Sequence, residues 1–136
     1  MSLATIQQPI EVEFTAFKEY YATLFRSNIP LLNRALSHVS RTNGKMMRPM
    51  LVLLTAKSIA GSVDERTNYA AAALELLHTA SLLHDDVVDE SPMRRGLPSL
   101  HTLFSNRIAI LAGDYIFSSA LQNAAMTKNV ETVFPR

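Results

Sequence analysis

Residues 69–89 read YAAAALELLHTASLLHDDVVD, a run of helix-forming residues that ends in three aspartates. Ala and Leu dominate the run, and neither Gly nor Pro interrupts it, which favours an α-helix. Its apolar residues occur on all sides rather than along one stripe, which is typical of a helix surrounded by other helices. We therefore expect a long helix from Val63 to about Glu90, roughly 40 Å in length at about 1.5 Å per residue.

Breakers and capping residues indicate the ends of this helix and of its neighbours. Ser62 is followed three residues later by Glu65, the pattern of a capping box, and Pro92 prevents the helix from continuing far beyond its aspartates. Asn106 is expected to cap the last helix of the chain. The other expected helices cover residues 11–26, 30–39, 46–60, 99–104 and 106–126. The sequence thus predicts an all-α protein.

Composition excludes several classes of protein. The 136 residues are 48% hydrophobic with a net charge of +1, which indicates one globular domain and no nucleic-acid partner. Cysteine is absent, so disulfides and thiolate chemistry are excluded. No apolar run approaches the roughly 20 residues of a membrane span. We expect a cytoplasmic protein without a membrane span, in which residues 1–10 are flexible.

The three aspartates at the end of the long helix indicate a metal site. Asp85 and Asp89 are four residues apart and share a helix face, near the helix end whose dipole disfavours carboxylates. Mg²⁺ would compensate this repulsion, because it prefers oxygen ligands and is usually held by one or two carboxylates plus phosphate oxygens. Asp86 lies beside them, and His78, two turns earlier, is expected to point into the same cavity. His84 lies off this face and is interpreted as structural.

Basic residues occur on both sides of the long helix. Arg94 and Arg95 follow its aspartates, and two guanidinium groups could bind phosphate oxygens bidentately. Lys45 and Arg48 lie at the start of the helix over 46–60, where free backbone N–H groups also favour anions. Taken alone, each pair is typical of a solvated surface. Together with the acids they predict a site for metal-bound phosphate groups.

Three motifs, in this order, resemble those of the trans-polyprenyl diphosphate synthases. Residues 44–49, GKMMRP, resemble the family's GKxxRP signature; residues 75–96, ELLHTASLLHDDVVDESPMRRG, resemble its first aspartate-rich motif; and residues 112–114, AGD, resemble a weaker landmark. The resemblance implies an isoprenoid-synthase-type helical bundle, of which residues 1–136 form a single partial domain, the amino-terminal half. It also implies a homodimer.

The resemblance also implies roles for individual residues. Asp85 and Asp89 would bind Mg²⁺ ions that bridge an allylic diphosphate, with Asp86 in support, and the metal would help to ionise the allylic carbon. The double bond of isopentenyl diphosphate would then attack the carbocation. Arg94 would hold the allylic diphosphate. The residues implied for the diphosphate of isopentenyl diphosphate are Lys45, Arg48, His78 and Arg95.

Chain length in this family depends on side-chain bulk upstream of the aspartates, on the wall of an apolar tunnel. Ala80 and Ser81 are small, which favours a long-chain product of the octaprenyl or solanesyl kind, while Leu77 and Leu74 would narrow the tunnel farther from the aspartates.

The family also has a second aspartate-rich motif on a later helix, and this chain has only Glu131 as an acid after Asp114. We therefore expect little turnover from this chain alone. Two alternatives stay open: a non-catalytic partner subunit of a heteromeric synthase, and a terpene cyclase. Gly113 and Asp114 are expected to form a close helix contact with a polar partner.

Overall fold

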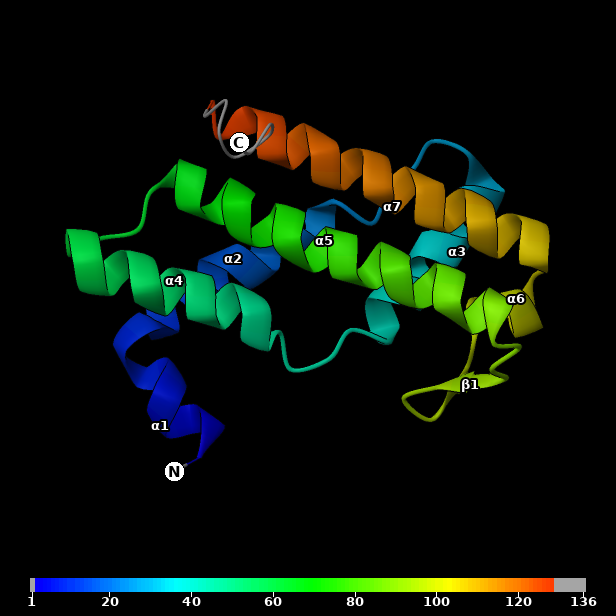
Figure 1. The fold of residues 1–136 in the computed structure, drawn as a ribbon, viewed down its shortest axis with the longest axis horizontal. Helices are drawn as coiled ribbons and strands as arrows, with labels where there is room; N and C mark the ends of the chain where they lie inside the picture. The colour runs from blue at the N-terminus through cyan, green and yellow to red at the C-terminus, as the bar shows by residue number, and fades with distance from the viewer. Residues whose placement is uncertain (1, 129–136) are drawn as a thin grey trace.

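A computed structural model describes residues 2–128, and most of these residues are helical (Figure 1). The elements in chain order are α1 Leu3–Gln7, the 3-10 turn η1 Gln8–Ile10, α2 Glu11–Thr23, α3 Pro30–Arg41, α4 Met47–Ala60, α5 Glu65–Val88, β1 Met93–Arg94, β2 Leu97–Pro98, α6 Leu100–Leu103 and α7 Asn106–Met126. The expected all-α fold is confirmed. The short hairpin of β1 and β2 was not expected.

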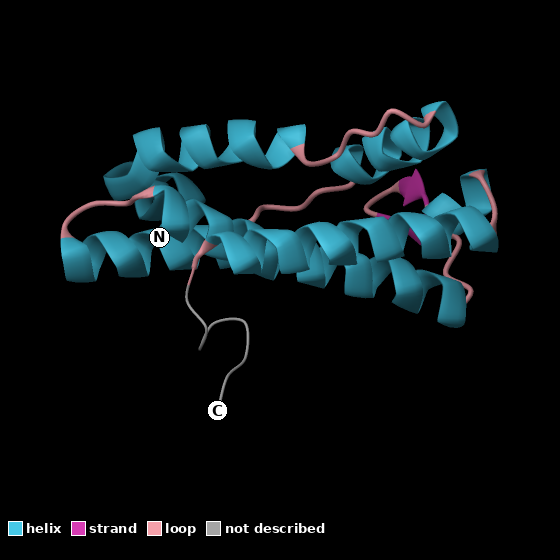
Figure 2. Ribbon diagram, turned by 90° about the horizontal axis from the view of Figure 1, so that it is seen from above, coloured by secondary structure: helices cyan, strands magenta, loops and turns pink. Residues whose placement is uncertain are grey.

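The long helix α5 lies at the centre of the bundle, with α4 along one side and α7 along the other (Figure 1). Seen from above, the long helices follow the longest axis of the molecule, and the hairpin lies towards one end (Figure 2). Small side chains let helix axes approach closely. Both α5 and α7 bury such residues: Ala71, Ala72, Ala80, Ala109, Ala112, Gly113 and Ala120.

Aromatic residues of α2 and of the segment just after it form part of the core beside α5. Phe17 and Tyr21 are fully buried and stack with ring centroids 5.6 Å apart, and Phe25 meets Tyr21 edge-on at 5.1 Å. The Tyr21 hydroxyl lies 3.3 Å from Oγ1 of Thr79 on α5, so the buried phenol has a polar partner. These contacts fix one face of α5 against the body of the protein.

Two predicted helix caps are wrong by one or two residues. Asp64, rather than Ser62, caps α5, because its extended backbone lets Oδ1 accept a hydrogen bond from the Thr67 amide at 3.0 Å. Ser105 caps α7 through a 3.1 Å bond from the Ile108 amide, and Asn106 is the first helical residue. In both cases an oxygen-bearing side chain one or two residues from the predicted cap takes its role.

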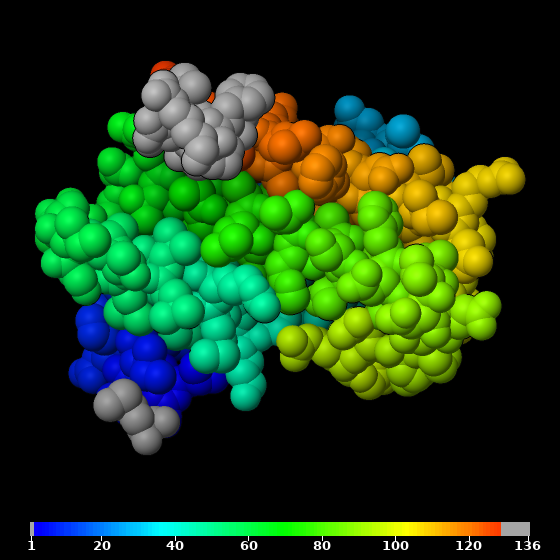
Figure 3. Space-filling model, in the orientation of Figure 1, coloured from blue at the N-terminus to red at the C-terminus, as the bar shows by residue number. Residues whose placement is uncertain are grey.

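One face of α5 is open, so the described helices do not surround its middle on all sides. On this face Leu74 and Leu77 are each 44% exposed. Figure 3 shows α4, α5 and α7 side by side on one face of the molecule. At the start of the chain, residues 3–10 form α1 and η1 and bury Ile10; flexibility in solution stays a prediction. Within residues 2–128, no helix combines the length and apolarity needed to cross a membrane.

Candidate functional site

The hairpin after α5 presents two arginines from a tight turn. Its strands pair Met93 with Pro98 and Arg94 with Leu97, which leaves Arg95 and Gly96 as a two-residue loop. Both loop residues have positive φ, 51° and 78°, as a type I′ turn requires. Glycine adopts this conformation freely, whereas an arginine there is strained. The turn therefore places Arg94 on a strand and Arg95 at the tip.

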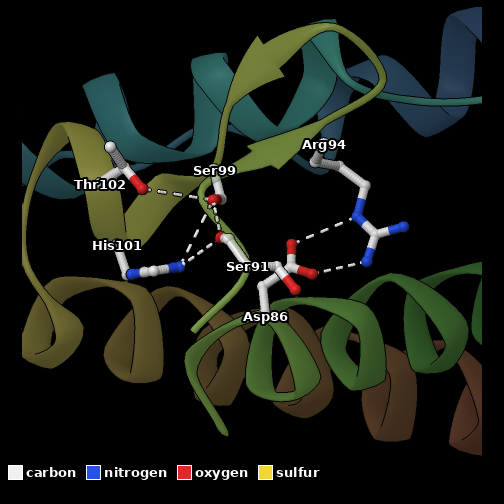
Figure 4. A network of polar contacts seen from close by, with 6 residues as sticks. All are labelled: Asp86, Ser91, Arg94, Ser99, His101 and Thr102. Atoms are coloured by element: carbon white, nitrogen blue, oxygen red, sulfur yellow. Dashed lines mark hydrogen bonds and ion pairs between the residues drawn. The ribbon is translucent and has the colours of Figure 1, made fainter. Parts of the chain in front are cut away.

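Hydrogen bonds to backbone carbonyls hold the base of the hairpin (Figure 4). The Ser91 carbonyl accepts hydrogen bonds from Oγ of Ser99 and, at 2.6 Å, from Nε2 of His101. On the other side, the buried His38 of α3 donates through Nε2 to the Pro98 carbonyl at 2.7 Å. Because a carbonyl can only accept, both imidazoles carry a hydrogen on Nε2. The hairpin is thus tied to α3 and to the residues that follow α5.

Arg94 and Asp86 form a two-pronged ion pair (Figure 4). Nε of Arg94 lies 3.2 Å from Oδ2 of Asp86, and Nη2 lies 2.5 Å from Oδ1. The Asp86 side chain is 5% exposed and that of Arg94 34%. The hydrogen bond to Asp86 raises the pKa of Arg94, so the guanidinium stays charged. This pairing fixes the orientation of Arg94 and leaves its remaining N–H groups for other acceptors.

Arg95 packs against the loop that precedes α4. A Cβ atom added to Gly44 would lie only 2.3 Å from Nη2 of Arg95 and 2.6 Å from its Cζ, so the space beside Gly44 is occupied by the guanidinium. Two segments that are about fifty positions apart in the chain therefore meet here: GKMMRP at residues 44–49 and RRG at residues 94–96. The absence of a side chain at residue 44 is what admits the Arg95 head group.

A cleft of about 350 Å³ lies between the hairpin, α5 and the start of α4. It brings together all five of the basic residues that were predicted to bind diphosphate: Lys45, Arg48, His78, Arg94 and Arg95. Asp86 and Glu75 of α5 also line it. The cleft has the size of a small-ligand site, and its basic groups favour an anion with several oxygens. The individual roles of these residues stay predictions.

Asp85 and Asp89 do not line this cleft, and the expectation that His78 and Asp85 point into one cavity stays a prediction. His78 shares the cleft with Asp86, which is about 100° around the helix from Asp85. Asp85 and Asp89 are exposed at the end of α5, and neither forms an ion pair within residues 2–128.

Free carboxylates of this kind fit Mg²⁺, which takes one or two of them and completes its shell with water and phosphate. Among the described residues, no group of three or more His, Cys, Asp or Glu side chains converges into a metal site. The chain therefore offers a partial set of oxygen ligands rather than a closed cage.

Glu75 also lines the cleft, and no role for it was predicted from the sequence. It is 6% exposed, and its Oε2 is buried without a hydrogen-bond partner in the described structure. Burial raises the pKa of this carboxyl, and the charges of His78, Arg48 and Arg95 oppose the rise. One signal was present in the sequence, because Glu75 is the only acidic or basic residue between positions 69 and 83 apart from His78.

The predicted contact at Gly113 is confirmed, and its partner is His84. A Cβ atom at Gly113 would lie 2.4 Å from Nε2 of His84, which in turn is 3.4 Å from Oδ1 of Asp114. His84 thus packs α5 against α7, in agreement with its structural interpretation.

The proposed chain-length residues do not share one environment. Ala80 is buried in the core with 2% exposure, whereas Ser81 and Leu77 are exposed on the open face of α5. A second hollow, of about 650 Å³, is lined by Arg48 together with Leu51, Val52 and Leu74. Because Arg48 lines both spaces, this apolar hollow adjoins the basic cleft.

Comparison with known proteins gives consistent matches. The polyprenyl synthetase family profile matches residues 29–134. A prenyl transferase of Cyanophora paradoxa is 37% identical over 97% of this chain and 42% of its own length. Heptaprenyl diphosphate synthase component 2 of Geobacillus stearothermophilus is 38% identical over 95% of this chain and 40% of its own length.

A solved structure is also similar to the chain. It is that of a polyprenyl synthase from Caulobacter crescentus complexed with calcium and isoprenyl diphosphate, with 28% identity and a TM-score of 0.85 over 96% of this chain and 39% of that one. The chain thus spans about two-fifths of the length of these relatives, in their amino-terminal part. With this fold, this cleft and these matches, the chain belongs to the polyprenyl synthetase family.

Proposed function

We propose that the chain supplies the diphosphate-binding part of a prenyltransferase that joins isopentenyl diphosphate to an allylic diphosphate. The observation that carries this proposal is the convergence of five predicted basic residues on one cleft, beside an exposed pair of carboxylates. A terpene cyclase needs no second diphosphate site, so the additional cations Lys45 and Arg48 argue against that alternative.

The basic residues divide between two diphosphates in this proposal. Arg94, held in place by Asp86, binds the allylic diphosphate with its remaining N–H donors. Lys45, Arg48, His78 and Arg95 bind the diphosphate of isopentenyl diphosphate. Arg48 lies in the first turn of α4, where free backbone N–H groups add to the attraction for an anion. Charge-assisted hydrogen bonds of this kind orient a substrate as well as binding it.

Asp85 and Asp89 are proposed to hold Mg²⁺ against the allylic diphosphate. The ion, when bound, would neutralise the departing diphosphate and so help to ionise the allylic carbon. The Caulobacter relative was crystallised with calcium and isoprenyl diphosphate, which supports a divalent cation with oxygen ligands in this family. Asp86 acts indirectly here, because its carboxylate is engaged with Arg94.

A long-chain product is the finer part of the proposal. The apolar hollow beside Arg48 and the open face at Leu77 and Ser81 offer room for a growing hydrocarbon chain. The Geobacillus relative is named for a heptaprenyl product. Because Ala80 is buried in the core, Ser81→Phe is the cleaner test of the tunnel wall. In an enzyme of full family length it should shorten the product, and an unchanged product length would contradict the assignment.

A homodimer in the cytoplasm completes the proposal, on the strength of the family resemblance. We expect little turnover from the 136 residues alone, since the chain spans about two-fifths of its relatives. The word "component" in the name of the Geobacillus relative favours a second candidate, a subunit of a heteromeric synthase. Incorporation of labelled isopentenyl diphosphate distinguishes the two: a heteromeric subunit would gain activity only on addition of a different polypeptide.

Binding of isopentenyl diphosphate, measured by calorimetry, tests the cleft directly. Lys45→Met should weaken binding by roughly 10- to 100-fold, because a charge-assisted hydrogen bond contributes about 1.5 to 3 kcal/mol. Lys18→Met is a matched control, since Lys18 lies outside the cleft over the Phe14 ring. Equal binding by the native chain and Lys45→Met would contradict the proposed site.

A further inference from the structure

Glu75 places an acid among bases, in a position that a diphosphate-binding cleft alone does not explain. Its side chain comes from the buried face of α5 and lines the cleft with His78, one turn later. An anion beneath an anion-binding surface opposes the binding of substrate. Such a violation of local rules is expected mainly where function compensates it.

Several positively charged groups surround Glu75 in the cleft without ligand. The titratable and charged groups that face it or line the same cleft come from α2, α4 with its preceding loop, α5 and the hairpin: Tyr21, Lys45, Arg48, His78, Asp86, Arg94 and Arg95. Arg94 is neutralised by Asp86. Three cations remain: Lys45, Arg48 and Arg95. Apart from Asp86, Glu75 is the one carboxylate among the described residues that line the cleft with them.

Oε2 of Glu75 has capacity for one further partner. It is buried and accepts no hydrogen bond from any described residue. A buried carboxylate without hydrogen bonds is costly, and a proton is the simplest way to remove that cost. Burial already raises the pKa of Glu75, and only the nearby positive groups oppose this.

We propose that Glu75 is a proton-linked residue of the cleft: its carboxylate offsets the positive charge of Lys45, Arg48 and Arg95 before substrate arrives, and Oε2 takes up a proton from solvent when diphosphate binds. The bound diphosphate neutralises Arg48 and Arg95, so the attraction that kept Glu75 ionised is lost and like-charge repulsion replaces it. The inference rests on the proposed function and deepens it. It predicts that diphosphate binding depends on pH through a group that does not touch the reacting atoms.

Calorimetric titration with inorganic pyrophosphate and Mg²⁺ tests this coupling. Titrations in buffers of different ionisation enthalpy, from about pH 5 to about pH 8, give the number of protons taken up per site across the range of carboxyl and histidine titration. The native chain should take up more protons than Glu75→Gln, with a difference approaching one at some pH in this range. His78→Gln is the control for the neighbouring imidazole, and it should still show the proton uptake that is assigned to Glu75.

The outcomes separate this inference from the proposed function. Equal proton uptake by the native chain and a pyrophosphate-binding Glu75→Gln would overturn the inference and leave the proposed function intact. Absence of pyrophosphate binding by the native chain would overturn both.

A second measurement needs no variant. The side-chain carboxyl ¹³C signal of Glu75 should titrate at a higher pH with saturating pyrophosphate than without it, and an unmoved midpoint would refute the coupling even if Glu75→Gln failed to fold.

Discussion

Replacing Gly44 by alanine should weaken diphosphate binding without destabilising the fold. The new Cβ would lie 2.3 Å from Nη2, 2.6 Å from Cζ and 3.1 Å from Nε of Arg95. Carbon atoms in contact prefer separations of about 3.5 to 4.0 Å, so the guanidinium must retreat by about 1 Å. All three atoms belong to the end of one exposed, flexible side chain, so the backbone does not have to move.

The size of the effect follows from the bond that Arg95 can no longer make. A hydrogen bond to a charged group contributes about 1.5 to 3 kcal/mol, which corresponds to roughly 10- to 100-fold in affinity. Stability should be unchanged or slightly higher, because Gly44 does not have a positive φ and alanine restricts the unfolded chain by about 0.4 to 1 kcal/mol.

Gly61→Ala provides the opposite outcome as a control. Gly61 has φ of 79° at the end of α4, and nothing lies within 4 Å of an added Cβ. Its replacement should cost about 1 to 2 kcal/mol through the left-handed backbone and leave diphosphate affinity unchanged. Urea denaturation and calorimetric binding, applied to both variants, separate the two effects.

A double-mutant cycle with Arg95→Ala shows whether the Gly44 effect passes through the guanidinium. The combined variant should bind no more weakly than Arg95→Ala alone. Additive losses, or a folded Gly44→Ala chain with native affinity, would refute the reasoning.

Three further changes test the ion pair, a helix cap and the buried acid. Arg94→Met should lower the free energy of unfolding by about 2 to 3 kcal/mol in urea denaturation. The loss is smaller than for a fully buried pair because the Arg94 side chain is 34% exposed. Adding Asp86→Asn to the Arg94→Met chain should restore most of the lost stability, because it removes the unpaired carboxylate. Ser105→Ala should cost about 1 kcal/mol in the same assay through the lost N-cap bond to Ile108, and an unchanged midpoint would contradict that role. For Glu75 the folded-state pKa lies above the ordinary value, so the native chain loses stability as pH rises from the ordinary carboxyl pKa through the folded one. Glu75→Gln should therefore have a higher melting temperature at neutral pH and none of this advantage in acid; a difference independent of pH would argue against a buried ionised carboxyl.

Most of the helical architecture could be predicted, because it depends on local signals. Proline at residue 30 and glycine at residue 61 mark helix ends directly, and the observed helices differ from the expected ones by three residues or fewer at their ends. The hairpin was missed because each strand has two residues, too few for any alternation to be visible. The turn at Arg95 and Gly96 contains only one residue that favours positive φ.

The cleft was harder to predict than the helices because its contacts are not local. Basic residues could be selected by their position in motifs, but no pattern indicated that Arg95 lies against Gly44. The different environments of the aspartates were not predicted either. Asp86 is buried against Arg94 whereas Asp85 is exposed, and this difference depends on where the hairpin packs. Glu75 carried no periodic signal, since a single acid in an apolar helix can be a surface residue or a buried one.

Because Arg95 has a left-handed backbone, protein stability and ligand binding favour different residues at position 95. Asn and Gly suit that turn position better than arginine does. A mutant library selected only for heat resistance should therefore drift towards Asn or Gly at position 95. The same library selected for retention on immobilised pyrophosphate should keep arginine, so the two selections report separately on the turn and on the cation that it presents.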